Sequence, residues 1–138
     1  MNIARGTFEV IPVSHPPYDA APGATIGRTS LTKTFAGDLV GTSTAEMIGA
    51  RTSTPGSAGY VAIERVTCSL ASETGPRTGT FVLQHSGTMA RGAMNLSCTV
   101  VPDSGTDDLV GIEGAVAITI VDRQHFYAFE WGIRVAGT

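Results

Sequence analysis

The sequence predicts an all-β domain, built as a single eight-stranded antiparallel barrel in which consecutive strands are neighbours. Apolar and polar residues alternate with a period of two along almost the whole chain, and no window shows a helical stripe. The composition is rich in threonine and includes 17 glycines. Threonine favours strands because its β-branched side chain suits a pleated surface. Turn sequences separate the alternating segments, and short turns make successive strands antiparallel.

Eight segments fit the strand pattern, and we treat residues 1–138 as one domain because 138 residues are about one domain's worth. The expected strands are Arg5–Val13, Ala24–Ala36, Leu39–Thr52, Tyr60–Ser72, Arg77–Met89, Ala93–Val101, Gly114–Val121 and His125–Val135. Closure into a barrel is favoured over an open sheet because it removes both edges. A sandwich is the rival, but it ordinarily needs longer crossovers than this chain offers.

Two segments interrupt the alternation. The Pro-rich segment from Ser14 to Gly23 cannot continue a ladder, because proline has no amide proton to donate. It is expected to be a loop folded over one end. Between Pro102 and Gly114, Thr106 or Asp107 is placed to cap one short helical turn, the only helix expected.

Composition and charge exclude several classes of partner and site. The net charge of −3 includes no basic stripe for a nucleic acid. No apolar run is long enough to span a bilayer, and the segment Met1–Gly6 lacks an apolar signal core, so a cytoplasmic protein is expected. Cys68 and Cys98 are expected to be reduced core residues. Neither a metal-ligand spacing nor a phosphate-binding glycine loop is present, so we expect no metal and no cofactor.

Strand register predicts a row of polar residues on the apolar face. With a turn at Ser72–Pro76, Glu64 lies opposite His85, and the alternation keeps the apolar residues of both strands on one face. Extending the same reasoning to neighbouring strands places one polar residue on each of five strands. The predicted row is Arg28, Glu46, Glu64, His85 and Cys98, and the stripe Tyr127, Phe129 and Trp131 is expected to share that interior.

This row is the candidate ligand-binding site, together with Tyr60 and Trp131, because buried ionisable groups are costly unless paired. Glu64 and His85 are the candidate catalytic residues, since neighbouring titratable groups have displaced pKa values. Each residue also has a structural interpretation. Glu46 and Arg28 make a plausible structural ion pair, and Cys98 a core thiol. The aromatic residues are candidates for packing as much as for ligand contact.

Several runs resemble an uncharacterised family of small bacterial proteins, a domain of unknown function with the allene-oxide-cyclase-like β-barrel fold. The runs are Gly6–Val10, Thr32–Asp38, Ile63–Val66, Gly79–Gly87, Val101–Thr106 and Leu109–Gly114. The resemblance spans nearly the whole chain and implies an eight-stranded antiparallel barrel related to plant allene oxide cyclase and dirigent proteins. It implies no activity, because fold does not carry function. The site motif of the plant enzymes is not reproduced, so none of their catalytic residues is transferred.

Three functions fit the sequence. The first is binding of a small apolar molecule inside the barrel, since eight strands leave room for one ligand or for side chains alone. The second is an isomerase or cyclase that uses Glu64 or His85 on a hydrophobic substrate. The third is a filled barrel that acts through subunit contacts. A homo-oligomer, with a dimer favoured, is expected from apolar residues predicted to face outward: Val61, Ile63, Val82, Leu31 and Phe35.

Overall fold

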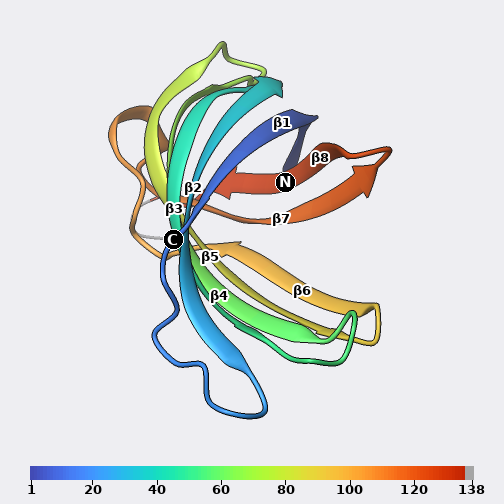
Figure 1. Ribbon diagram of the computed structural model, residues 1–138. Coiled ribbons are helices and arrows are strands. Elements are labelled where there is room, and N and C mark those ends of the chain that lie inside the picture. The colour runs from blue at the N-terminus through green and yellow to red at the C-terminus, as the bar shows by residue number, and fades with distance from the viewer. Residues whose placement is uncertain (136–138) are drawn as a thin grey trace.

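The structure, a computed structural model, describes residues 1–135 and is a closed antiparallel barrel of eight strands in chain order (Figure 1). The strands are β1 (Asn2–Ser14), β2 (Thr25–Gly37), β3 (Leu39–Arg51), β4 (Ala58–Leu70), β5 (Arg77–Ala90), β6 (Ala93–Val100), β7 (Ile112–Val121) and β8 (Gln124–Ile133). The predicted fold class is confirmed, and all eight expected segments are strands.

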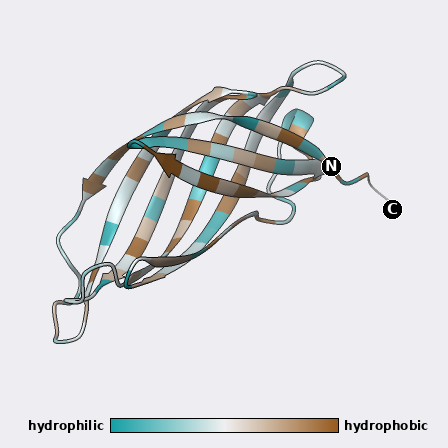
Figure 2. Ribbon diagram, turned by 90° about the vertical axis from the view of Figure 1, so that its right-hand side faces the viewer, coloured by the Kyte–Doolittle hydropathy of each residue, from teal (hydrophilic) through white to brown (hydrophobic). Residues whose placement is uncertain are grey.

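The alternating pattern determines which side chains fill the barrel. Hydrophilic and hydrophobic residues follow one another along the strands (Figure 2), and the buried residues of β4 and β5 recur at every second position. β1 pairs with β8 as well as with β2, with Gly6 opposite Tyr127, so the first and last strands leave no free edge between them. No helix within residues 1–135 is long and apolar enough to cross a membrane.

Both interruptions of the strand pattern lie where they were predicted. The loop after β1 returns along β2: the amide of His15 donates to the carbonyl of Arg28 at 3.0 Å, and that of Tyr18 to the carbonyl of Ile26 at 2.8 Å. Between β6 and β7 the chain forms a short 3-10 turn, η1 (Asp107–Leu109), preceded by Thr106. The side chain of Thr106 accepts a hydrogen bond from the amide of Thr80, which ties the turn to β5.

The register between β4 and β5 differs from the prediction by two residues. Glu64 lies opposite Leu83, and His85 lies opposite Ala62. The connection is longer than expected because the amide of Ala71 bonds to the carbonyl of Asp38 in the β2–β3 turn, and not to β5. A shift of two residues leaves every side chain on its predicted face, so the interior of these two strands was assigned correctly.

The register between β3 and β4 differs by one residue, which reverses the face of β3. Ala45 lies opposite Glu64, and Glu46 lies opposite Ile63 on the outer surface. The predicted inward position of Glu46 is therefore wrong. On β2 the predicted faces are also reversed: Leu31 and Phe35 point inward and Arg28 outward. Of the apolar residues expected outside, Val61 and Ile63 are exposed, and the homo-oligomer stays a prediction.

The interior is packed at one end of the barrel. Phe81 and Phe129 stack with ring centroids 5.5 Å apart. The largest fully buried side chains are, with one exception, apolar; they are Trp131, Phe81, Phe129, Leu70, Leu109, Ile112, Glu64 and Val66. Glu64 is the exception, and it lies at the boundary between the packed end of the barrel and a more open part of the interior.

Candidate functional site

Glu64 is the centre of a buried polar cluster. Its Oε1 atom accepts hydrogen bonds from Lys33 Nζ at 3.0 Å and from His85 Nε2 at 2.7 Å. Its Oε2 atom accepts a hydrogen bond from the Ser43 hydroxyl at 2.5 Å. Only 1 % of Glu64 is exposed, and Lys33, Ser43 and His85 are also buried. Four consecutive strands, β2 to β5, thus each supply one member of the cluster.

Cys98 extends the cluster onto β6. It lies directly opposite His85 in the register between β5 and β6, as predicted, and its sulfur lies 3.5 Å from His85 Nε2. Burial raises the pKa of the Cys98 thiol to about 12, and the negative charge of Glu64 adds to the effect. The thiol is therefore protonated at neutral pH and is a poor nucleophile. Cys68 is also a free, buried thiol.

Lys33 and Ser43 were not identified from the sequence. Lys33 alternates with Leu31 and Phe35, and these apolar neighbours were assigned to the outer face. Had the strand been placed with Phe35 inside, Lys33 would have been recognised as an inward-facing cation. Ser43 carries no charge and has no such signal, because serine is common on both faces of this Thr- and Ser-rich barrel.

The cluster holds Glu64 in its ionised form. Burial by itself would raise the pKa of this carboxyl, but the hydrogen bond from His85, the positive charge of Lys33 and the hydrogen bond from Ser43 outweigh it. They hold the pKa of Glu64 at about 2. The ammonium of Lys33 also lies 4.9 Å from the centre of the Phe8 ring, a favourable cation–π contact.

A hollow of about 190 Å³ lies against the cluster, on the side away from the packed end. Lys33, Glu64 and His85 are part of its wall, and the rest of that wall is mainly apolar: Phe8, Val10, Leu31, Ala45, Met47, Tyr60, Ala62, Ile118 and His125. On the opposite side, the space between the cluster and Phe81 and Phe129 amounts to only about 20 Å³. The polar cluster is therefore the floor of a cavity.

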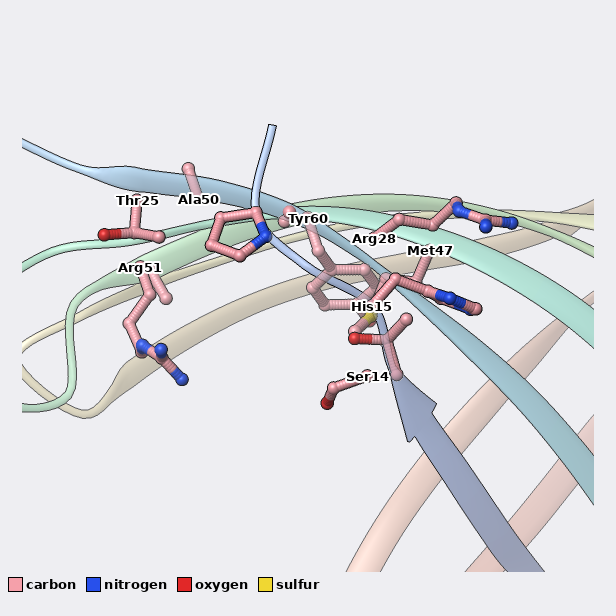
Figure 3. A pocket seen from close by; sticks show the side chains of 14 residues that line it. Ser14, His15, Thr25, Arg28, Met47, Ala50, Arg51 and Tyr60 are labelled. Carbon is pink, nitrogen blue, oxygen red and sulfur yellow. The ribbon is translucent and has the colours of Figure 1, made fainter. Parts of the chain in front are cut away.

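Tyr60 lines this hollow and two others. One, of about 340 Å³, is bounded by Ser14 at the end of β1, by His15 and Pro17 of the first loop, and by Met47 and Tyr60 (Figure 3). The other, of about 270 Å³, runs past Tyr60 and His85 to Cys98 and Leu96. Tyr60 is therefore part of the wall of all three hollows.

A glycine makes room for the ring of Tyr60. A methyl group on Gly87 would lie 2.5 Å from a ring carbon of Tyr60, so the ring occupies the space that a side chain would take. The absence of a side chain at Gly87 thus lets the ring lie against β5. At Gly27, by contrast, a methyl group would make only an ordinary contact with Pro17, at 3.5 Å.

The barrel wall has a gap between β6 and β7, next to the hollow of about 270 Å³. β6 and β7 are paired only between Thr99 and Ala115, and beyond that pair the two strands diverge (Figure 1). The hollow of about 270 Å³ lies there, with Leu96, Ser97 and Cys98 of β6 on one side and Val116, Ala117 and Ile118 of β7 on the other. The gap leads from the surface to His85.

Of the residues selected from the sequence, Glu64, His85, Cys98 and Tyr60 lie together in the interior. Arg28 and Glu46 do pair, at 2.8 Å, but on the outer surface, with both side chains well exposed. The pKa of Glu46 is lowered by its hydrogen bond from Ser30 and by the bond and charge of Arg28, which together outweigh the opposing effect of desolvation. Trp131 is buried at the packed end, away from the hollows around Tyr60. Within residues 1–135, no group of three histidine, cysteine, aspartate or glutamate side chains is arranged to hold a metal ion.

Comparison with known proteins agrees with this architecture. The family model described as "Protein of unknown function (DUF3224)" matches residues 4–131. The chain belongs to the DUF3224 family. A crystal structure of a DUF3224 protein of unknown function from Shewanella oneidensis MR-1 is 41 % identical, with a TM-score of 0.87. The match covers 98 % of this chain and 99 % of that one. No curated protein matches this DUF3224 chain.

The stability of this DUF3224 protein is expected to fall steeply in acid. The pKa of Glu64 is about 2 in the folded protein against an ordinary value of 4.5. Its contribution is therefore fully present above pH 4.5 and is lost as the pH falls towards 2. The difference corresponds to about 3 kcal/mol of unfolding free energy. Urea titrations at several pH values measure it. Glu64→Gln lacks the ionisation and should show a correspondingly weaker dependence; equal dependence in both proteins would refute the assignment.

Proposed function

We propose that the barrel binds a small, mainly apolar molecule that carries one polar group. The observation that supports this most is the apolar hollow of about 190 Å³ with Lys33, Glu64 and His85 in its wall. Small-molecule sites are typically concave, mostly apolar, and supplied with a few convergent polar groups. A barrel that served only as a structural support would have no need for a hollow beside its most costly buried charges.

The wall favours an uncharged polar group on the ligand. The carboxylate of Glu64 is balanced by the ammonium of Lys33 in a direct ion pair, so the pair adds no net charge. An ionised ligand group would enter this apolar space without a counter-charge. A carbonyl or hydroxyl group carries no such cost, and it can accept a hydrogen bond from an N–H of Lys33 that Glu64 does not use.

The hollow can be filled without changing the polar cluster. Ala62 faces the hollow from β4, and its neighbour Val61 faces outward and is exposed. We expect Ala62→Trp to occupy the space and abolish ligand retention, and Val61→Trp to retain the ligand. The measurement is native mass spectrometry of each protein purified from its own host, with the mass of any retained molecule read directly.

Three results would contradict the proposal. The first is a wild-type protein that carries no molecule and also binds none of a panel of apolar ketones and alcohols in solution. The second is an Ala62→Trp protein that is folded and still retains the same mass. The third is a ligand lost equally from the Val61→Trp protein, which would place the site on the outer surface.

A further inference from the structure

We propose that the hollow is a proton-transfer site for carbonyl compounds, in which His85 Nδ1 is the base and Lys33 holds the carbonyl oxygen. This rests on the proposed binding function and adds a reaction to it. The expected substrate is an apolar ketone with an acidic C–H next to the carbonyl group, and the expected reaction is an isomerisation.

The hydrogen bonds of Glu64 decide which nitrogen of His85 is free. An ionised carboxylate can only accept hydrogen bonds, so the bond of 2.7 Å between Glu64 Oε1 and His85 Nε2 requires the proton to be on Nε2. In the neutral imidazole, Nδ1 then carries a lone pair.

The free nitrogen of His85 faces open space. Within residues 1–135, Nδ1 has no hydrogen-bond partner, and no buried side-chain nitrogen or oxygen is left both enclosed and unpartnered. Nδ1 must therefore reach one of the hollows that His85 lines, although only 6 % of the residue is exposed. A nearly buried imidazole with a free lone pair on a cavity is suited to general base catalysis.

Lys33 supplies the complementary group. Lys33 Nζ and His85 Nε2 bond to the same oxygen of Glu64, and both residues line the hollow of about 190 Å³. A ketone oxygen placed at Lys33 brings its neighbouring carbon towards His85. Charge that develops on that oxygen is stabilised by the ammonium in an apolar surrounding, where such interactions are strong.

The reaction is balanced without a cofactor. Nδ1 takes a proton from the carbon between a carbonyl group and a C=C double bond. The electron pair of that C–H bond forms a C=C bond to the carbonyl carbon, and the π pair of the carbonyl group moves onto its oxygen. The resulting dienolate is held by Lys33. The protonated Nδ1 then returns the proton to the far carbon of the original double bond, whose π pair forms the new C–H bond. The enolate C=C pair moves to the adjacent C–C bond as the oxygen lone pair re-forms the carbonyl. The product is the conjugated isomer of the substrate.

Other titratable groups near the hollow are less suited to be the base. The Cys98 thiol is protonated for the reason given above. His125 lines the same hollow, but it packs on Phe8 with ring centroids 5.0 Å apart and has no carboxylate partner within the described residues. The charged and titratable groups that line the same spaces as His85 are Lys33, Tyr60, Glu64, Cys98, His125 and Tyr127.

The test uses 3-cyclohexen-1-one as the probe, with the full-length protein. Binding is measured by saturation-transfer NMR, and conversion to 2-cyclohexen-1-one by its ultraviolet absorbance. Deuterium incorporation between the carbonyl and the double bond, followed in D₂O, reports proton removal on its own. We expect binding, exchange and isomerisation.

Substitutions separate the base from its neighbours. His85→Gln should lower the rate by a factor of about 100 or more, the usual contribution of a general base. The glutamine amide can still donate to Glu64, so binding and fold should persist. Lys33→Met should also lower the rate, because the charge that develops on the carbonyl oxygen loses its ammonium partner. Gln84→Ala, on the outer face beside His85, should leave the rate unchanged.

Every outcome bears on one of the two proposals. A probe that binds but shows neither exchange nor isomerisation above the His85→Gln level overturns the reaction and leaves the binding function intact. A probe that does not bind counts against both. Loss of activity in His125→Gln in place of His85→Gln makes the assignment of the base wrong. Should His85→Gln not fold, ¹⁵N NMR of the wild-type histidines decides: a proton on Nδ1 of neutral His85 overturns the proposal.

Discussion

Replacing Glu64 by alanine is expected to lower the free energy of unfolding by about 3–5 kcal/mol. The substitution removes the acceptor shared by Lys33, His85 and Ser43, all of which are buried. Lys33 would then remain in the interior without its counter-charge, and this uncompensated charge is the largest part of the loss. Urea or guanidinium denaturation at pH 7 measures the change.

The surface pair provides a matched control, because Glu46 bonds a cationic side chain, that of Arg28, at 2.8 Å, but both side chains are exposed. Glu46→Ala should change stability far less, since solvent and salt screen exposed pairs. Adding Lys33→Met to Glu64→Ala should restore part of the lost stability by removing the unpaired charge. Similar losses in Glu64→Ala and Glu46→Ala, with no recovery in the double variant, would contradict this account of the cluster.

Leucine to alanine substitutions are expected to distinguish the two ends of the barrel. Leu70 is completely buried in the packed core, and Leu31 is half-buried in the wall of the hollow. Leu70→Ala should cost about 2–5 kcal/mol, because it removes buried apolar surface and leaves a cavity. Leu31→Ala only enlarges a space that already exists, so its cost should be clearly smaller.

The same pair of variants also tests the ligand site. Thermal unfolding with and without a bound probe should show that Leu31→Ala changes the stabilisation by the ligand, whereas Leu70→Ala leaves it the same, because only Leu31 borders the hollow. Equal costs for the two substitutions in the ligand-free protein would mean that the barrel is packed alike at both ends.

The fold could be predicted because its determinants are local. The alternation of apolar and polar residues has the period of a strand, and turn residues separate the alternating segments. Each strand can therefore be recognised from about a dozen consecutive residues. The inner face of β4 could also be predicted, because the apolar residues Val66, Cys68 and Leu70 lie at every second position after Glu64 and so on the same face of the strand. The same holds for His85 and Cys98, whose short turn at Arg91 and Gly92 leaves little freedom in register.

The candidate site could be predicted only in part, because its residues come from several strands. Its prediction therefore needs the correct register of every strand pair between them, and errors in register accumulate. One residue of error in the β3–β4 connection placed Glu46 inside and concealed Ser43, and the reversed face of β2 concealed Lys33. A one-residue shift exchanges the two faces of a strand, whereas a two-residue shift, as between β4 and β5, does not. Longer connections admit both kinds of shift.

The sequence by itself thus determined the class of fold, the order of the strands and the inward positions of Glu64, His85 and Cys98. Only the tertiary structure decided that Lys33 completes their charge balance, that Arg28 and Glu46 lie outside, and that the cluster borders a hollow. Periodicity is a property of a few neighbouring residues. The charge partners and the empty space depend on how eight strands close around one another, which no single strand specifies.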